Sequence, residues 1–222
     1  MADYLFSPFA GMMRCKDICP NGALALAYRI EDDSSDPWTE RVNRVKFPRA
    51  GSTLKSRAAA ASVLAKCLSE IQFPAKSLGV TAALGHNDRT MRNGSALSQI
   101  GQSLASQLSL PWLPALLSRE PTGELKQAGS PNNRFSMLHE KYTAIVCHGH
   151  DGILLLDDFS TVGTTLREIT RAVKASNPLT KVIGILLGKN ETRSYWAGKG
   201  VNISNDHIPQ AMADLWDATE RG

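Results

Sequence analysis

The sequence has no long hydrophobic run, few cysteines and few aromatic residues. In 222 residues no window approaches about 18 unbroken apolar residues, so we expect no membrane-spanning helix. The start of the chain has no basic segment followed by a long apolar stretch, so we expect no secretion signal. The four cysteines are scattered, which argues against a disulfide framework and favours a cytoplasmic location.

Metal-binding and hydrolytic motifs are also scarce. Cys15 and Cys19 form one close pair, but tetrahedral zinc needs four ligands and no second pair follows, which favours free thiols. Cys147, His148 and His150 in "CHGH" are a second metal candidate, for which a loop before a strand is the simpler interpretation. The Gly-x-Ser-x-Gly pattern of a nucleophile elbow is absent, so Ser-His-Asp hydrolysis has no support.

The net charge of +4 is too small to identify a partner, and a phosphate-bearing small molecule would suit it as well as a nucleic acid. The basic run from Arg41 to Arg57 is a candidate nucleic-acid patch. Because only 6% of the residues are aromatic, few side chains could stack on bases, and a solvated helix face is favoured. Trp196, Trp216 and the tail "DLWDATERG" are interpreted as surface or partner-facing packing.

Alternating helix and strand patterns predict an α/β sheet with helices on both faces. The irregular, polar residues 1–40 predict a small N-terminal lobe, and residues 41–222 the α/β domain. Residues 121–133 carry Pro, Gly, Ser and Asn without periodicity and predict a long functional loop. Helices are predicted over residues 52–71, 95–110 and 164–177, and strands over 77–85, 111–120, 153–156 and 181–190.

The stretch "GILLLDDFSTVGTTL", residues 152–166, has the clearest chemical pattern. Asp157 and Asp158 follow four aliphatic residues, at the carboxyl end of a predicted strand, where parallel α/β sheets bind ligands. Two adjacent carboxylates repel each other, and vicinal sugar hydroxyls or a divalent cation would offset that repulsion. A solvated acid at a simple helix cap is the alternative.

The turn after these acids predicts an anion site. It leads into a helix N-terminus, where free N–H groups and the helix dipole attract negative charge. Gly163 allows the backbone to approach a ligand closely. The hydroxyl groups of Thr161, Thr164 and Thr165 can donate to phosphate oxygens. Ribose at the acids and phosphate at the turn would together be one ribose 5-phosphate unit.

This stretch resembles the phosphoribosyl-diphosphate signature of type I phosphoribosyltransferases, an apolar strand leading into two acids and a threonine-rich turn. "RTMRNGSALSQIGQSLASQLSLPWLPALLSRE", from Arg89 to Glu120, is similar to the ComF-like branch of that family, as is "ERVNRVKF" at residues 40–47. The likeness covers roughly residues 40–190. It implies a Rossmann-like parallel-sheet core and magnesium-dependent transfer of ribose 5-phosphate to a nitrogenous acceptor, with pyrophosphate release.

The resemblance also implies roles for individual residues. Asp157 and Asp158 would bind the ribose hydroxyls, with Mg²⁺ nearby. Arg89 and Arg92, in the loop from His86 to Gly94, would face the pyrophosphate. The segment from Arg119 to Arg134 would close over the reaction. The implied catalytic residues are Asp157, Asp158, Arg119 and Arg134, and the implied phosphate-binding residues are Thr161, Gly163, Thr164 and Thr165.

The chain departs from the family pattern at several positions. Phe159 and Ser160 stand where aliphatic residues are usual, and Val162 replaces a threonine. The loop motif changes after Arg92, and the zinc ribbon of the branch is missing. A second hypothesis therefore stands beside catalysis, in which the pocket senses a phosphoribosyl compound or nucleotide and acts with a protein partner in DNA uptake or defence. A homo-oligomer or a complex subunit is expected in either case.

Overall fold

A computed structural model of the chain describes residues 8–9, 11–15, 22–46, 53–73, 75–122 and 130–222. Its centre is a twisted sheet in which four strands run parallel in the order β3-β8-β7-β4, and β2 and β1 extend it antiparallel beyond β3. The predicted α/β class is confirmed. The strands are β1 (Pro8–Phe9), β2 (Met12–Cys15), β3 (Ala23–Ile30), β4 (Leu78–Ala82), β7 (Gly152–Ser160) and β8 (Lys181–Glu191).

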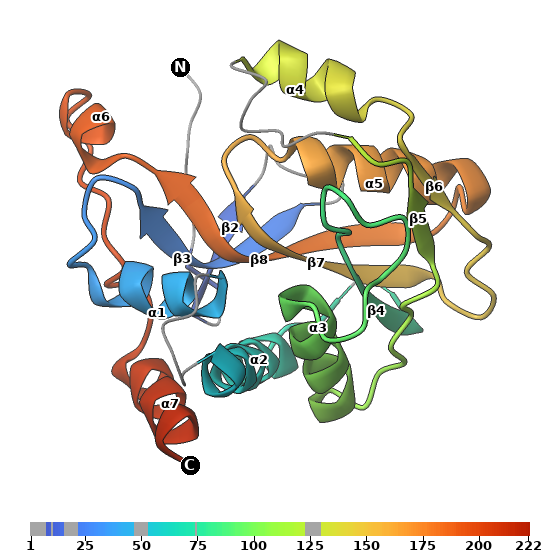
Figure 1. The fold of residues 1–222 in the computed structure, drawn as a ribbon. Coiled ribbons are helices and arrows are strands. Elements are labelled where there is room, and N and C mark those ends of the chain that lie inside the picture. The colour runs from blue at the N-terminus through green and yellow to red at the C-terminus, as the bar shows by residue number, and fades with distance from the viewer. Residues whose placement is uncertain (1–7, 10, 16–21, 47–52, 74, 123–129) are drawn as a thin grey trace.

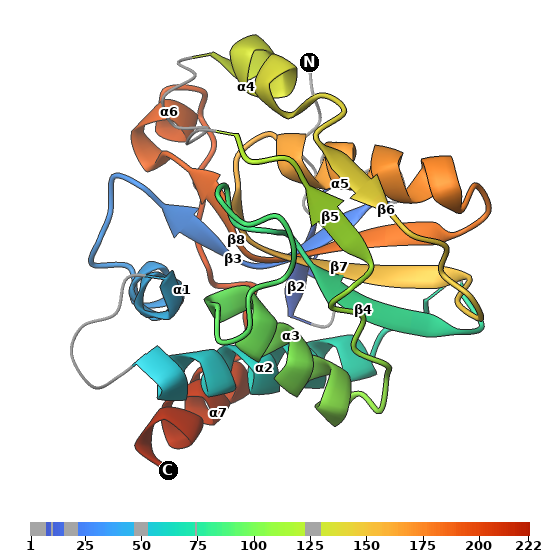
Figure 2. The same cartoon turned by 45° about the vertical axis from the view of Figure 1, so that its right-hand side comes forward.

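Helices cover both faces of the sheet, as Figures 1 and 2 show. One face packs against α1 (Pro37–Lys46), α2 (Thr53–Ser69), α3 (Ala96–Gln107) and α7 (Gln210–Arg221). The other face packs against α5 (Thr164–Ser176), with residues of α4 (Pro131–Leu138) and α6 (Arg193–Ala197) in the same core. A small antiparallel sheet of β5 (Leu117–Arg119) and β6 (Tyr142–Ala144) lies on that second side.

The two central strands are aliphatic because both of their faces are covered. Ile153 and Leu155 of β7 lie in the core on the α5 side, whereas Leu154 and Leu156 lie in the core on the α2 side, and all four are fully buried. This alternation is what a strand with helices on both faces requires. Predicted strands over β4, β7 and β8 and predicted helices over α2, α3 and α5 are confirmed to within a few residues.

Strand β3 and helix α4 were not expected from the sequence. β3 pairs in parallel with β8, from Ala23 opposite Gly184 to Ile30 opposite Glu191. The lobe boundary predicted at residue 40 falls inside α1. Strand β3, which precedes that boundary, belongs to the main sheet. Helix α4 begins at Pro131, within the predicted loop, and Ser130 Oγ caps it by accepting from Asn133 N at 3.2 Å. Residues 123–129 lie outside the described part.

The surface placement expected for two tryptophans is wrong. Trp216 of α7 is fully buried, and its ring meets that of Trp38 edge-on at a centroid distance of 5.9 Å. Trp196 is 7% exposed and belongs to the opposite core. The amphipathic pattern of α7 thus serves the core of this chain, because its apolar face packs on α2.

We expect Trp216→Ala to lower the free energy of unfolding by about 3–5 kcal/mol, the usual cost of removing a fully buried large aromatic side chain. Urea denaturation followed by circular dichroism measures the loss. Trp216→Phe is the matched control and should lose clearly less, since it keeps an aromatic ring against Trp38. A loss below about 1 kcal/mol for the alanine variant would contradict the packing described.

Among the described residues, no helix combines the length and apolar character needed to cross a membrane.

Candidate functional site

The candidate site lies where the parallel strands end. The last residue pair between β7 and β4 joins Leu156 to Ala82, and Ala83 N donates to Leu156 O at 2.8 Å just beyond it. From Asp157 to Ser160, β7 continues in the sheet with β8 alone as its described neighbour. The two acids therefore stand at the carboxyl edge of the sheet, as the sequence predicts, where ligands of parallel α/β proteins collect.

Asp157 is buried, with 7% of its surface exposed. It shares the strand face of Ile153 and Leu155, and its Oδ1 accepts from Asp158 N at 2.9 Å. Burial and the neighbouring Asp158 carboxylate raise the pKa of Asp157 from 3.8 to about 7, against the opposing effect of Lys46 and Arg119. A buried carboxyl group with such a raised pKa at a strand end has the character of a functional group.

Asp158 faces the other side of the strand and is ion-paired. Its Oδ2 lies 2.5 Å from Nζ of Lys46, the last residue of α1. The ammonium also lies 5.4 Å from the centroid of the Phe159 ring, and the Arg29 guanidinium lies 5.0 Å from the same centroid. Gly188 supports this arrangement, because a Cβ there would lie 3.0 Å from the ring. The unexpected Phe159 thus binds two cations beside the acids.

The turn that follows is fixed by hydrogen bonds inside the protein. Ser160 Oγ accepts from Gly163 N at 2.9 Å, and Thr161 O accepts from Lys189 Nζ at 2.5 Å. Gly163 has a φ of 73°, the left-handed region that favours glycine, and it directly precedes α5. No side chain of the described residues caps α5, so its first N–H groups remain for another acceptor.

The threonines of this turn lie at its outer side. Thr161 is exposed, and Thr164 and Thr165 are partly exposed at the first turn of α5. The structure therefore brings the predicted phosphate-binding residues together at one helix N-terminus, next to the acids in the chain. Ser160, which departs from the family pattern, acquires a structural role as the acceptor that closes the turn.

Arg119 lies inside the protein. It belongs to β5 and is 6% exposed. Its Nη1 donates to Leu84 O at 3.2 Å and to Gly85 O at 3.3 Å, and its Nη2 donates to Thr122 Oγ1. Its guanidinium also lies 5.2 Å from the Tyr142 ring centroid. Through these contacts the Arg119 side chain connects β5 to the segment that follows β4. Its Nε has no partner among the described residues.

The loop from His86 to Gly94 is hydrogen-bonded to the same segment, at Arg119 and Thr122. Arg119 N donates to Arg89 O at 2.8 Å, and Thr122 N donates to His86 O at 3.1 Å. The side chains of Arg89 and Arg92 are exposed, and Nε of Arg92 lies 4.0 Å from Asp88 Oδ1. The loop backbone is held, and both arginine side chains reach solvent. Arg134 falls in α4, and its side chain lies outside the described part.

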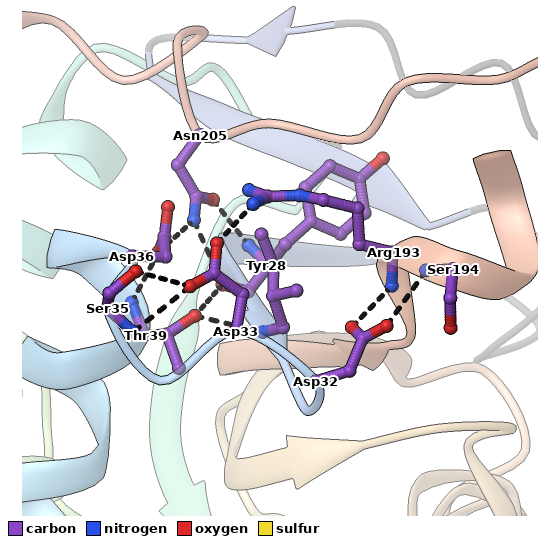
Figure 3. A network of polar contacts seen from close by, with 10 residues as sticks. Tyr28, Asp32, Asp33, Ser35, Asp36, Thr39, Arg193, Ser194 and Asn205 are labelled. Atoms are coloured by element: carbon purple, nitrogen blue, oxygen red, sulfur yellow. Dashed lines mark hydrogen bonds and ion pairs between the residues drawn. The ribbon is translucent and has the colours of Figure 1, made fainter.

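Three more acidic side chains, Asp32, Asp33 and Asp36, follow β3, and donors of the protein itself already contact them, as Figure 3 shows. Asp32 accepts from the backbone N–H groups of Arg193 and Ser194 at 2.7 and 2.8 Å, at the start of α6. These bonds hold the pKa of Asp32 at about 2. Asp33 pairs with the Arg193 side chain, and Asp36 Oδ1 accepts from Thr39 N and Asn205 Nδ2. This network joins β3 to the segment after β8.

Three cations of the basic run that is a candidate for nucleic-acid binding, Arg41, Arg44 and Lys46, are ion-paired within the chain. Arg41 contacts Asp217 with two hydrogen bonds, at 3.0 and 2.7 Å. Arg44 contacts Glu220 in the same way, at 3.3 and 2.8 Å. Both pairs join α1 to α7, so these arginines serve helix packing. Residues 47–52 of the run lie outside the described part.

Within the described part of the chain, Cys147, His148 and His150 do not form a metal cage. The described residues contain no cluster of three or more His, Cys, Asp or Glu side chains that could hold an ion. Cys15 and Cys147 are buried thiols, and Cys19 lies outside the described part. Since one oxygen of Asp158 already contacts Lys46, the acids would supply Mg²⁺ with few ligands. Mg²⁺ usually takes substrate phosphates and water as its remaining ligands, and the acids fit that mode.

Three groups of this edge were missed by sequence reasoning. The sequence pattern indicates a solvated helix face for the run that contains Lys46 and a strand for Lys189, and it indicates no role for Tyr142. Tyr142 is fully buried, and its OH donates to Leu84 O at 3.2 Å. The sequence did contain a signal for Lys189, because it is a charged residue after a run of aliphatic residues, as Asp157 and Asp158 are in β7.

Comparison with protein-family models and with curated proteins finds no match for this chain.

Proposed function

We propose that the carboxyl edge of β7 binds a ribose 5-phosphate group, and that the chain is a type I phosphoribosyltransferase-like protein of the ComF-like branch. The observation that carries this proposal is one continuous stretch. The buried Asp157, the ion-paired Asp158 and the left-handed Gly163 at the start of α5 follow one another at the end of a central parallel strand. Acids suit the ring hydroxyls, and the uncapped helix start suits the phosphate.

The proposed reaction replaces pyrophosphate at the anomeric carbon of the donor by a nitrogen nucleophile. Asp157 and Asp158 hold the ribose, and the turn from Thr161 to Thr165 holds the 5-phosphate. Arg89 and Arg92 are exposed on the loop after β4, at the same edge of the sheet, and their positive charges would face the diphosphate. Mg²⁺, when bound with the donor, would neutralise charge on the leaving diphosphate.

Binding without turnover is the second candidate function, and the position of Arg119 favours it. In the proposed mechanism an arginine of this segment closes over the donor, but Arg119 is buried and donates to backbone carbonyl groups. An arginine held in this way positions the loop and is not available to the leaving group. In this alternative the occupied site is sensed by a protein partner.

Titration calorimetry with phosphoribosyl diphosphate tests the proposal. We expect a dissociation constant of about 1–100 μM with Mg²⁺, in the range of ordinary enzyme substrates, and weaker binding without it. Glucose 6-phosphate, which presents the same phosphate on a different ring, is the control and should bind far more weakly. Absence of binding by the folded protein in both conditions would reject the proposed site.

Pyrophosphate release separates the two candidate functions. The donor is incubated with Mg²⁺ and a panel of bases and amines, and free pyrophosphate is measured. Release that depends on one acceptor supports the transferase. Tight donor binding with no release from any acceptor supports the sensing module.

A further inference from the structure

We propose that Lys189 is the positioning residue that gives the turn after β7 its affinity for a phosphate monoester dianion. The inference rests on the proposed function, because it concerns the 5-phosphate end of the same site. Lys189 lies near the end of β8, opposite Ser160 of β7 and Tyr28 of β3, and is 5% exposed. A lysine so deeply buried is costly unless its ammonium group is well paired, so its partners show what it does.

The ammonium has two partners, one in the turn after β7 and one at the end of β8. Nζ donates to Thr161 O at 2.5 Å and lies 2.7 Å from Glu191 Oε1. The other carboxylate oxygen of Glu191 accepts from Trp196 Nε1 at 2.7 Å, which holds the acid toward α6. The pair is therefore a dipole whose positive end faces the turn and whose negative end is tied away from it.

The contact with Thr161 O decides the orientation of one peptide group. In a trans peptide the C=O and the following N–H point in opposite directions, and the described backbone contains no cis peptide. Because Lys189 draws Thr161 O into the protein, the N–H of Val162 points away from Lys189. Thr161 and Val162 are exposed, so that outer side is open to solvent.

The same contact removes a source of repulsion. A carbonyl oxygen directed at the phosphate would oppose binding, and Lys189 takes up that oxygen. Two buried titratable groups that interact with the pair are neutral, because burial raises the pKa of the Cys15 thiol to about 12 and raises that of the Tyr28 phenol. Among the described contacts of Lys189, Glu191 is the one carboxylate.

Three variants and one probe test the inference. Ribose 5-phosphate is titrated calorimetrically at pH 6.5 into the wild type, Lys189→Met, Glu191→Gln, and the double variant. We expect Lys189→Met to weaken binding about tenfold or more, through loss of a charge-assisted contact and of the peptide orientation. The double variant should be weakened to a similar degree, and it avoids leaving one buried charge without a partner.

Glu191→Gln should have the opposite effect. It keeps an acceptor near Trp196 but removes the negative end of the dipole, so we expect binding to tighten about threefold or more. A purely structural pair would instead weaken binding in all three variants, and that result would overturn the inference. Unchanged affinity in the Lys189→Met and double variants would also overturn it. No binding of ribose 5-phosphate or of phosphoribosyl diphosphate to the wild type would remove the proposed function itself.

Discussion

Asp157→Asn is expected to raise the free energy of unfolding at pH 8 by about 2–4 kcal/mol and to change it little at pH 4. In the folded protein the pKa of Asp157 is about 7, above its ordinary value of 3.8. Folding therefore favours the protonated acid, and the cost of ionising it develops as pH rises from about 4 and is complete above 7. At about 1.4 kcal/mol per pKa unit, the upper bound is about 4 kcal/mol.

Urea denaturation at pH 4, 6 and 8 measures this effect. Asparagine can still accept the hydrogen bond from Asp158 N, so the contact is preserved while the charge is removed. Asp151→Asn is the matched control: Asp151 is exposed at the opposite end of β7, and its pKa is lowered by hydrogen bonds from Ser77 N and Lys76 N. It should gain no stability at pH 8. An equal change at all three pH values in the Asp157 variant would show that burial of the charge is not the cause.

The double variant Asp157→Asn, Asp158→Asn is expected to weaken binding of phosphoribosyl diphosphate about 100-fold or more. Each carboxylate accepts a charge-assisted hydrogen bond in the proposed site, and such bonds contribute about 1.5–3 kcal/mol. Two of them correspond to at least two factors of ten in the dissociation constant. The loss arises at the ligand, since Asp157→Asn alone should stabilise the fold.

Calorimetry with Mg²⁺ measures this loss, and circular dichroism verifies that the variant is folded. The Asp151→Asn protein again serves as the control, because it carries the same chemical change at the far edge of the sheet and should bind like the wild type. Equal affinity in the double variant and the wild type would place the ligand elsewhere and end the proposal.

The two predictions together describe one conflict between stability and function. A buried acid whose pKa is raised lowers the free energy of unfolding when it ionises, so its presence needs a reason outside folding. If Asp157→Asn gains stability while the double variant loses the ligand, the cost of burying the carboxyl group is linked to binding. The Lys46 ammonium and the Arg119 guanidinium reduce that cost by lowering the pKa of Asp157.

The part of the fold that sequence reasoning predicted is the part whose signals are local. β7, α5 and β8 follow one another as an aliphatic run, a helical pattern and a second aliphatic run, and each is readable without the others. The start of α4 was also readable, because Ser130 and Pro131 are typical cap residues, although the loop composition around them outweighed that signal.

The elements that were missed depend on distant partners. β3 is an inner strand of the sheet because it pairs with β8, which is far along the chain. Asp157 and Asp158 were placed correctly at a strand end, but the sequence could not show that Lys46 is the counter-ion of Asp158. Nor could it show that Arg119, at the end of the strand predicted over residues 111–120, is turned inward toward Leu84 and Gly85, since those acceptors lie more than 30 residues away in the chain. Long-range pairing decides these cases, and periodicity carries no information about it.

Helix α7 is linked to Asp158 through α1, because α1 is ion-paired with both. Lys46 ends a helix whose two arginines are ion-paired with Asp217 and Glu220 of α7, so residues of α7 help to position the cation beside Asp158. A substitution at Asp217 or Glu220 would therefore affect the proposed sugar-binding acids without contacting them directly.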